Sequence, residues 1–116
     1  MVIYIAGPMT GLPAYNRDAF MEAAALMTAA GHTVLNPAVL PTTLADHAYM
    51  PICTAMIDAA DAIYLLDGWQ KSIGARAERL YAKRQRKLEL TEKDVNIRAR
   101  QIAREERRKT DAEGQN

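Results

Sequence analysis

The chain has 116 residues, of which 49% are hydrophobic and 25% are charged, and this length supports the core of one domain but not of two. Its single cysteine, Cys53, excludes an internal disulfide framework, and the two histidines lie too far apart in the sequence to complete a zinc site with it. No apolar run has the length of a membrane span, and a net charge of +1 argues against a general nucleic-acid binder. We therefore expect a soluble cytoplasmic protein that uses no metal and no cofactor and binds neither membranes nor nucleic acids.

The N-terminal part of the chain predicts two strands and a helix. Residues 2–6, VIYIA, form a short apolar run that ends at Gly7, which is typical of a buried strand. A turn-rich loop follows, and Asn16 is a suitable N-cap for a helix over 17–31. The second strand is predicted at 33–36.

The middle of the chain predicts two further helices and two further strands. Residues 38–49 show no clear hydrophobic period, so we expect a loop there. The elements predicted after this loop are a helix from Pro51 to about Ala60, a strand at 62–66, a helix over 73–87 capped by Ser72, and a strand within 87–90.

Strands that are continuous apolar runs and alternate with helices indicate a parallel sheet covered on both faces. The sequence therefore predicts a small doubly wound α/β domain of four to five strands over residues 1–90. Residues 91–116 are a charged tail, with helix formers up to Lys109 and a narrow apolar stripe. This tail is either a solvated helical extension or a surface that packs on a second subunit through Val95, Ala99, Ile102 and Ala103.

Glu78 stands out on the predicted helix over 73–87, which carries many basic residues. Its neighbours three and four residues away, Gly74, Ala75, Tyr81 and Ala82, are all uncharged. Glu78 is therefore either a group that faces a ligand or a partly buried acid bonded to the backbone or to a tyrosine, Tyr4 or Tyr81.

The ligand edge of a doubly wound sheet lies beyond the carboxyl ends of its strands. By this rule, the ligand edge of the predicted sheet includes residues 7–11, 36–37 and 67–74. The start of the helix over 73–87 offers free backbone N–H groups to an anion, and Ser72 and Gly74 are small enough to let a phosphate approach. Glu78 would then face the same pocket one turn further in, at the depth of a sugar.

Four segments of the chain resemble the nucleoside 2-deoxyribosyltransferase superfamily, especially a small branch frequent in bacteria and their phages. They are IYIAGPMTG at 3–11, GHTVLNP at 31–37, DAIYLLDGW at 61–69 and SIGARAERLYA at 72–82. The resemblance implies a Rossmann-like domain in which Glu78 is the nucleophile, because Gly74, Glu78 and Ala82 match the pattern G-x-x-x-E-x-x-x-A. It further implies that Glu78 attacks C1′ of a deoxyribose and expels the base, leaving an ester that water or a second base resolves.

Position 72 separates two branches of this superfamily. The transferases typically carry an aspartate there, which contacts the 5′-hydroxyl, whereas the nucleoside 5′-monophosphate N-hydrolases carry a serine that contacts the phosphate. Ser72 therefore implies a nucleotide substrate and hydrolysis. Base exchange and nucleotide binding without catalysis remain as alternatives, and the resemblance also implies a homo-oligomer, a dimer or larger.

The acid that assists the leaving base is where the chain departs from the superfamily. Cys53 stands where both branches usually place an acidic residue. Either Asp58 or Asp67 takes over, or the base needs little protonation, or the protein binds nucleotides without turning them over. We take Asp67 as the second catalytic candidate.

The remaining candidates are substrate-binding residues at the ligand edge. Met9 and Thr10 match the base-contacting loop of the superfamily, next to Gly7, and Asn36 ends the second predicted strand. All of these are equally consistent with turn residues. Trp69 would either stack on a base or fill the loop after the third strand.

Overall fold

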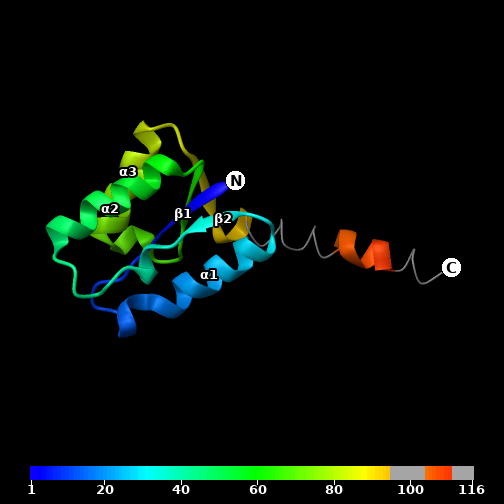
Figure 1. The fold of residues 1–116 in the computed structure, drawn as a ribbon, viewed down its shortest axis with the longest axis horizontal. Helices are drawn as coiled ribbons and strands as arrows, with labels where there is room; N and C mark the ends of the chain where they lie inside the picture. The colour runs from blue at the N-terminus through cyan, green and yellow to red at the C-terminus, as the bar shows by residue number, and fades with distance from the viewer. Residues whose placement is uncertain (95–103, 111–116) are drawn as a thin grey trace.

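The computed structural model describes residues 1–94 and 104–110, and residues 104–110 are helical. The elements of residues 1–94 follow one another in the order that the sequence predicts (Figure 1). They are β1 (Val2–Ala6), α1 (Arg17–Ala29), β2 (Thr33–Leu35), α2 (Asp46–Ala59), β3 (Ala62–Leu65), α3 (Ile73–Arg84) and β4 (Leu88–Thr91), with short 3-10 turns η1 (Pro13–Asn16), η2 (Pro37–Val39) and η3 (Trp69–Lys71).

The four strands form one sheet in the order β2-β1-β3-β4, and all neighbouring strands are parallel. The chain leaves β1 toward β2 on one side and then crosses to β3 on the other side, so the strand order reverses between β1 and β3. The predicted doubly wound α/β class is confirmed. In this class of sheet, the reversal opens a crevice at the carboxyl ends of the two central strands.

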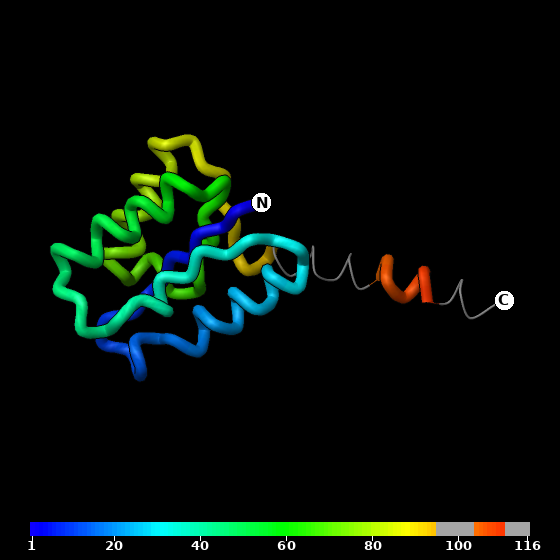
Figure 2. Tube along the Cα trace, viewed as in Figure 1, coloured from blue at the N-terminus to red at the C-terminus, as the bar shows by residue number. Residues whose placement is uncertain are grey.

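Alternate residues of β1 point to opposite faces of the sheet. Ile3 and Ile5 pack with the buried residues of α1, whereas Tyr4 and Ala6 pack with those of α2 and α3. Figure 2 shows the trace of β1 running through the middle of the domain, between α1 and the pair α2 and α3. This alternation places the Tyr4 side chain on the same face of the sheet as α3.

The prediction for 38–49 was wrong at its end, because α2 begins at Asp46 and not at Pro51. Pro51 lies inside the helix, where it cannot donate the backbone hydrogen bond of an ordinary residue. This loss is tolerated because His47 and Pro51 are both exposed, so the unpaired carbonyl faces water. The earlier start brings Asp46 and Tyr49 onto the helix.

Two predicted helix ends also differ from the structure. Asn16 makes no side-chain capping bond to α1, and its side-chain amide instead donates to the Pro8 carbonyl oxygen at 3.0 Å. The helix α3 ends at Arg84, before the predicted residue 87, because Arg86 adopts a left-handed conformation with φ of 59°.

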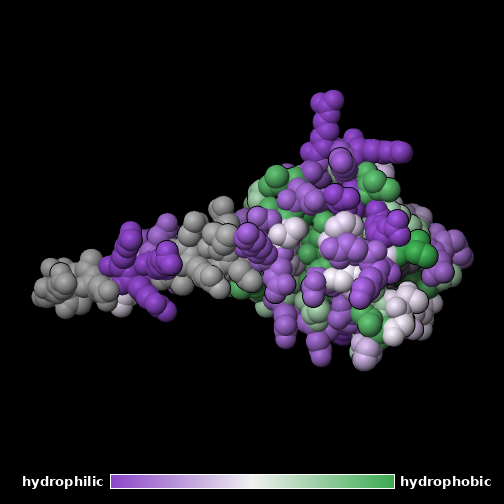
Figure 3. All heavy atoms as spheres, turned by 180° about the vertical axis from the view of Figure 1, so that it is seen from behind, coloured by the Kyte–Doolittle hydropathy of each residue, from purple (hydrophilic) through white to green (hydrophobic). Residues whose placement is uncertain are grey.

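The surface at the end of α3 is strongly charged. Lys83, Arg84 and Arg86 are exposed there, and Figure 3 shows hydrophilic side chains projecting from the top of the domain, where Figure 1 draws this end of the helix. Each helix among the described residues is too short or too polar to cross a membrane. The apolar stripe predicted in the tail falls within 95–103, outside the described residues.

Gly7 allows the loop after β1 to pass close to the end of β3. A Cβ atom added at Gly7 would lie 2.7 Å from the Cβ atom of Leu66, and Gly7 is buried. We expect Gly7→Ala to lower the free energy of unfolding by about 1–3 kcal/mol, because neither backbone can easily move away. Urea denaturation of both proteins measures this.

The matched control is Gly74→Ala, since an added Cβ at Gly74 meets only the Ser72 Oγ atom, at 4.0 Å. This variant should be as stable as the wild type, or more stable by up to ~1 kcal/mol, because alanine favours the helix. Equal stability of Gly7→Ala and the wild type would show that the close approach is unimportant.

Candidate active site

A cavity of about 430 Å³ opens between the loop after β1 and the start of α3. Its volume lies in the usual range for small-molecule sites. Six of the residues predicted from the sequence line this one cavity: Gly7, Met9, Thr10, Ser72, Gly74 and Glu78. A cavity is therefore present where the strand order predicts a crevice, and Glu78, the predicted nucleophile, lies in its wall.

Glu78 is held from below by Tyr4. The Tyr4 hydroxyl donates a hydrogen bond to Oε2 of Glu78, and the Tyr4 side chain is fully buried. No ion pair reaches Glu78 among residues 1–94 and 104–110; the salt bridge found there joins Arg79 Nε to Glu89 Oε1 at 2.6 Å. The carboxylate thus has a hydroxyl partner and no cationic partner.

Burial raises the pKa of Glu78 from 4.5 to about 7, and the hydrogen bond from Tyr4 opposes this rise only in part. The pKa of Tyr4 is also raised, first by burial and then by the nearby carboxylate, so the hydroxyl remains a donor. An acid whose pKa lies near neutrality, in the wall of a cavity, is typical of functional sites.

The start of α3 is suited to an anion. Ser72 caps the helix, because its Oγ atom accepts a hydrogen bond from the Ala75 backbone N–H at 3.2 Å. The hydroxyl proton of Ser72 remains free to be donated, and the first-turn N–H groups of Ile73 and Gly74 point along the helix axis toward the cavity end. Lys71 also lines the cavity and adds a positive charge.

Cys53 does not supply the acid that the superfamily places at its position. It is only 2% exposed on α2, and its thiol interacts with the hydroxyls of Tyr4 and Tyr49 beneath the cavity. Burial raises the pKa of the Cys53 thiol, which makes it a weaker proton donor than a free cysteine.

Three predicted site residues are not brought into the cavity. Asp67 lines a separate hollow of about 360 Å³ together with Glu22 of α1, on the opposite face of the sheet. The Asn36 side chain accepts a hydrogen bond from the Ala38 N–H at 3.0 Å and caps η2. Trp69 packs against the core beneath α2 and α3, with the Arg79 guanidinium 4.9 Å from its ring centre.

Sequence reasoning missed Asp46 and Tyr49, which line the cavity from α2. The spacing of Asp46, Tyr49 and Cys53 by three and then four residues was the available signal of a helix face. Asp46 and Glu78 are the two carboxylates in the cavity wall. Asp58, a predicted alternative acid, instead accepts a hydrogen bond from the Tyr81 hydroxyl at 2.6 Å and lies outside the cavity lining.

Residues 1–90 match the family described as "Domain of unknown function (DUF4406)". The chain belongs to this family. No curated protein matches the sequence. Among solved structures, the DUF4406 domain is similar to a 2-desoxiribosyltransferase from Leishmania mexicana, with a TM-score of 0.65 and 26% sequence identity; the match covers 78% of this chain and 62% of that chain. The similarity supports the Rossmann-like α/β fold and agrees with the resemblance noted in the sequence.

The raised pKa of Glu78 predicts a pH dependence of stability. Below pH 4.5 Glu78 is protonated in the folded and unfolded states alike, and its full contribution to the stability of the folded DUF4406 domain is present. This contribution is lost as the pH rises through about 7, because the folded state holds the proton more tightly than the unfolded state does. We expect the free energy of unfolding to fall by up to about 3 kcal/mol relative to Glu78→Gln between pH 4.5 and 8. Denaturation curves at a series of pH values measure this.

Glu22→Gln is the matched control, because Glu22 is an exposed acid of α1 outside the cavity lining. Its removal should change stability by less than about 1 kcal/mol. Parallel pH curves for the wild type and Glu78→Gln would contradict a partly buried carboxylate whose charged form is destabilised.

Proposed function

We propose that this DUF4406 domain is an N-glycosidase that hydrolyses the bond between base and sugar in (deoxy)nucleoside 5′-monophosphates. One observation carries the proposal: Glu78, a partly buried carboxylate without an ion-pair partner among the described residues, lines the same cavity as the start of α3. Glu78 lies six residues beyond Ser72, which is roughly 9 Å along a helix. A phosphate at the helix start would thus leave room for a sugar over the carboxylate.

The phosphate subsite consists of the Ser72 hydroxyl and the N–H groups of Ile73 and Gly74. These donors and the positive end of the helix dipole stabilise a dianionic group, and Lys71 adds charge at the cavity wall. A carboxylate at position 72 would repel the phosphate, so the serine favours a nucleotide over a nucleoside.

Glu78 acts as the nucleophile. Because Tyr4 occupies Oε2, Oε1 is the oxygen left to bond with C1′. As this bond forms, the bond between C1′ and the base nitrogen breaks, and its electron pair leaves with the base. No cation pairs with Glu78 in the part of the chain that the structure describes, which keeps the carboxylate reactive, while Tyr4 fixes its orientation.

We assign the proton that the departing base needs to Asp46, the second carboxylate of the cavity. The Asp46 carboxyl donates this proton, and its carboxylate then accepts a proton from water. The water oxygen bonds to C1′, the ester bond to Glu78 breaks, and the Glu78 carboxylate is regenerated. The net products are the free base and a sugar 5-phosphate.

A transferase that exchanges bases is the second candidate. It is supported by the similarity to the Leishmania mexicana 2-desoxiribosyltransferase. In this reaction a second base, in place of water, resolves the ester on Glu78. Exchange predicts that a labelled free base enters the nucleoside or nucleotide pool, whereas hydrolysis predicts only release.

Incubation with a panel of nucleoside 5′-monophosphates and the matching nucleosides tests the proposal, with chromatography of the free base as readout. We expect the free base to be released from the monophosphates. The value of kcat/KM should rise as the pH increases through about 7, because Glu78 must ionise. Glu78→Ala should lower the activity by ~10³-fold or more. Ser72→Asp should lose the preference for the phosphate. Lys83→Ala, at an exposed residue of α3 outside the cavity lining, should keep full activity.

Ligands that raise the melting temperature while no base is released would contradict catalysis and favour a nucleotide-binding protein. Activity that survives Glu78→Ala would remove Glu78 from the nucleophile role.

A pair of aspartate variants tests the assignment of the acid. Asp46→Asn should lower kcat by ~10²-fold or more for bases that leave poorly, since an amide cannot supply the proton. Asp67→Asn, on the other face of the sheet, should leave kcat unchanged. The reverse result would return the acid role to Asp67.

A further inference from the structure

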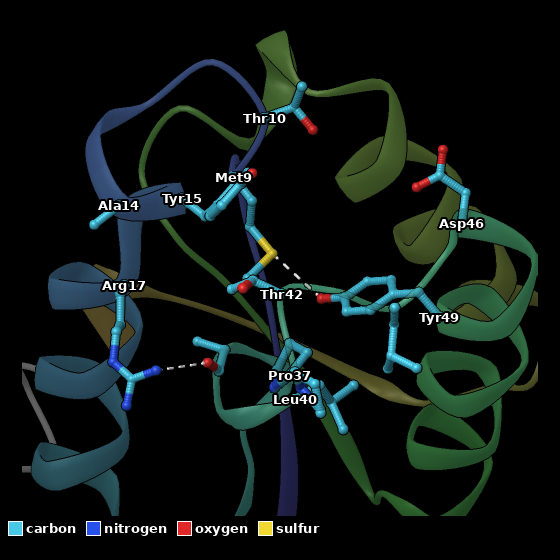
Figure 4. A pocket seen from close by; sticks show the side chains of 13 residues that line it. Met9, Thr10, Ala14, Tyr15, Arg17, Pro37, Leu40, Thr42, Asp46 and Tyr49 are labelled. Carbon is cyan, nitrogen blue, oxygen red and sulfur yellow. Dashed lines mark hydrogen bonds between the residues drawn. The ribbon is translucent and has the colours of Figure 1, made fainter.

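A second hollow of about 220 Å³ continues from the main cavity. Five residues line both spaces, namely Met9, Thr10, Pro37, Asp46 and Tyr49. The two spaces are therefore lobes of one cleft. We call the smaller space the second lobe; the residues that line it alone include Ala14, Tyr15, Ala38, Leu40, Thr42 and Leu44 (Figure 4).

The lining residues give the cleft a direction. Ser72, Gly74 and Glu78 line the main cavity only, the five shared residues form the wall between the spaces, and the second lobe lies beyond them. A nucleotide with its phosphate at Ser72 and its C1′ at Glu78 has its base against the shared wall. The far edge of that base then faces the second lobe.

The partition between the two lobes is a weak contact. The Tyr49 hydroxyl donates to the Met9 Sδ atom at 3.3 Å, and Figure 4 shows this contact spanning the space between the loop after β1 and α2. A thioether is a weak acceptor, and the flexible methionine side chain adapts to irregular groups. A ligand atom can therefore replace this contact at little cost.

The walls of the second lobe are mainly apolar. Leu40 and Leu44 contribute aliphatic side chains, and the Ala38 carbonyl oxygen is already the acceptor for Arg17 Nη1, at 3.3 Å. Figure 4 shows Arg17 turned toward this carbonyl, away from Met9 and Tyr49. Such walls suit an apolar group better than the polar edge of a base.

One wall of the second lobe is a strained segment. Ala14, Tyr15 and Asn16 have φ values of 49°, 54° and 60°, a left-handed conformation that costs roughly 1–2 kcal/mol for each non-glycine residue. The bond from Asn16 to the Pro8 carbonyl oxygen helps to hold the segment. Strain of this kind persists where the surrounding structure enforces a shape, commonly beside a ligand.

We propose that the second lobe binds an apolar substituent carried by the base, so that the preferred substrates are nucleoside 5′-monophosphates with an alkyl or aryl group on the base. This inference rests on the proposed function, which places the phosphate and the sugar. Met9 and Tyr49 are its specificity-determining residues, because the substituent passes between them.

Binding to the Glu78→Gln protein, which cannot form the ester, tests the proposal by calorimetry. The probes are two matched pairs: adenosine 5′-monophosphate with its N6-propyl derivative, and deoxyuridine 5′-monophosphate with its 5-propyl derivative. We expect the propyl member of at least one pair to bind about tenfold or more tightly, since it buries three additional carbon atoms. The parent nucleotides serve as the internal reference.

Two neighbouring threonine variants in the same background locate the effect. Thr42→Phe fills the second lobe and should abolish the gain without weakening the parent nucleotide, whereas Thr43→Phe, at an exposed neighbour outside the lining, should keep it. Thermal melts confirm that both variants fold.

Equal affinity within both pairs of nucleotides, or a gain in affinity that survives Thr42→Phe, overturns this proposal alone. Failure of all four nucleotides to bind overturns the proposed function as well.

Discussion

The partial burial of the Glu78 carboxylate against the Tyr4 hydroxyl is the constraint on which the rest of the site depends. With a pKa of about 7, the group is divided between its neutral and charged forms at neutral pH. Burial makes ionisation unfavourable, and a single hydroxyl donor offsets only part of that cost. A fold selected for stability alone would place an apolar or a salt-bridged residue here, so the arrangement is typical of a functional site.

The neighbouring elements make this pair possible. Tyr4 reaches α3 because it lies in the central strand β1 and because alternate residues of a strand face opposite ways. Gly7 then lets the chain turn closely past Leu66, so that the following loop forms one wall of the cavity while α3 forms the other. The strand β1 and the loop that follows it therefore supply both Tyr4, the partner of the Glu78 carboxylate, and the cavity wall opposite α3.

Local rules explain what the sequence predicted well and what it did not. Ser72 as a cap and the uncharged neighbours of Glu78 depend only on spacing within one helix, and the Ser72 cap is present in the structure. Asp46 was missed because Pro51 is a strong signal for the start of a helix. That Pro51 instead lies at an exposed position inside α2 is set by tertiary packing. Asp67 lies at the predicted edge, but nearness to a strand end does not determine which face of the sheet a side chain takes.

The cations of α3 are kept away from Glu78 by two devices. Arg76 and Lys83 are on the exposed side of the helix, so water solvates them. Arg79, the residue after Glu78, is held by its salt bridge to Glu89 on β4 and lies over the Trp69 ring. An exposed pair of this kind contributes little to stability, but it fixes the direction of the guanidinium. Its main effect is therefore on the site, because a guanidinium turned toward Glu78 would lower the pKa of the carboxylate and weaken it in the nucleophile role that we propose.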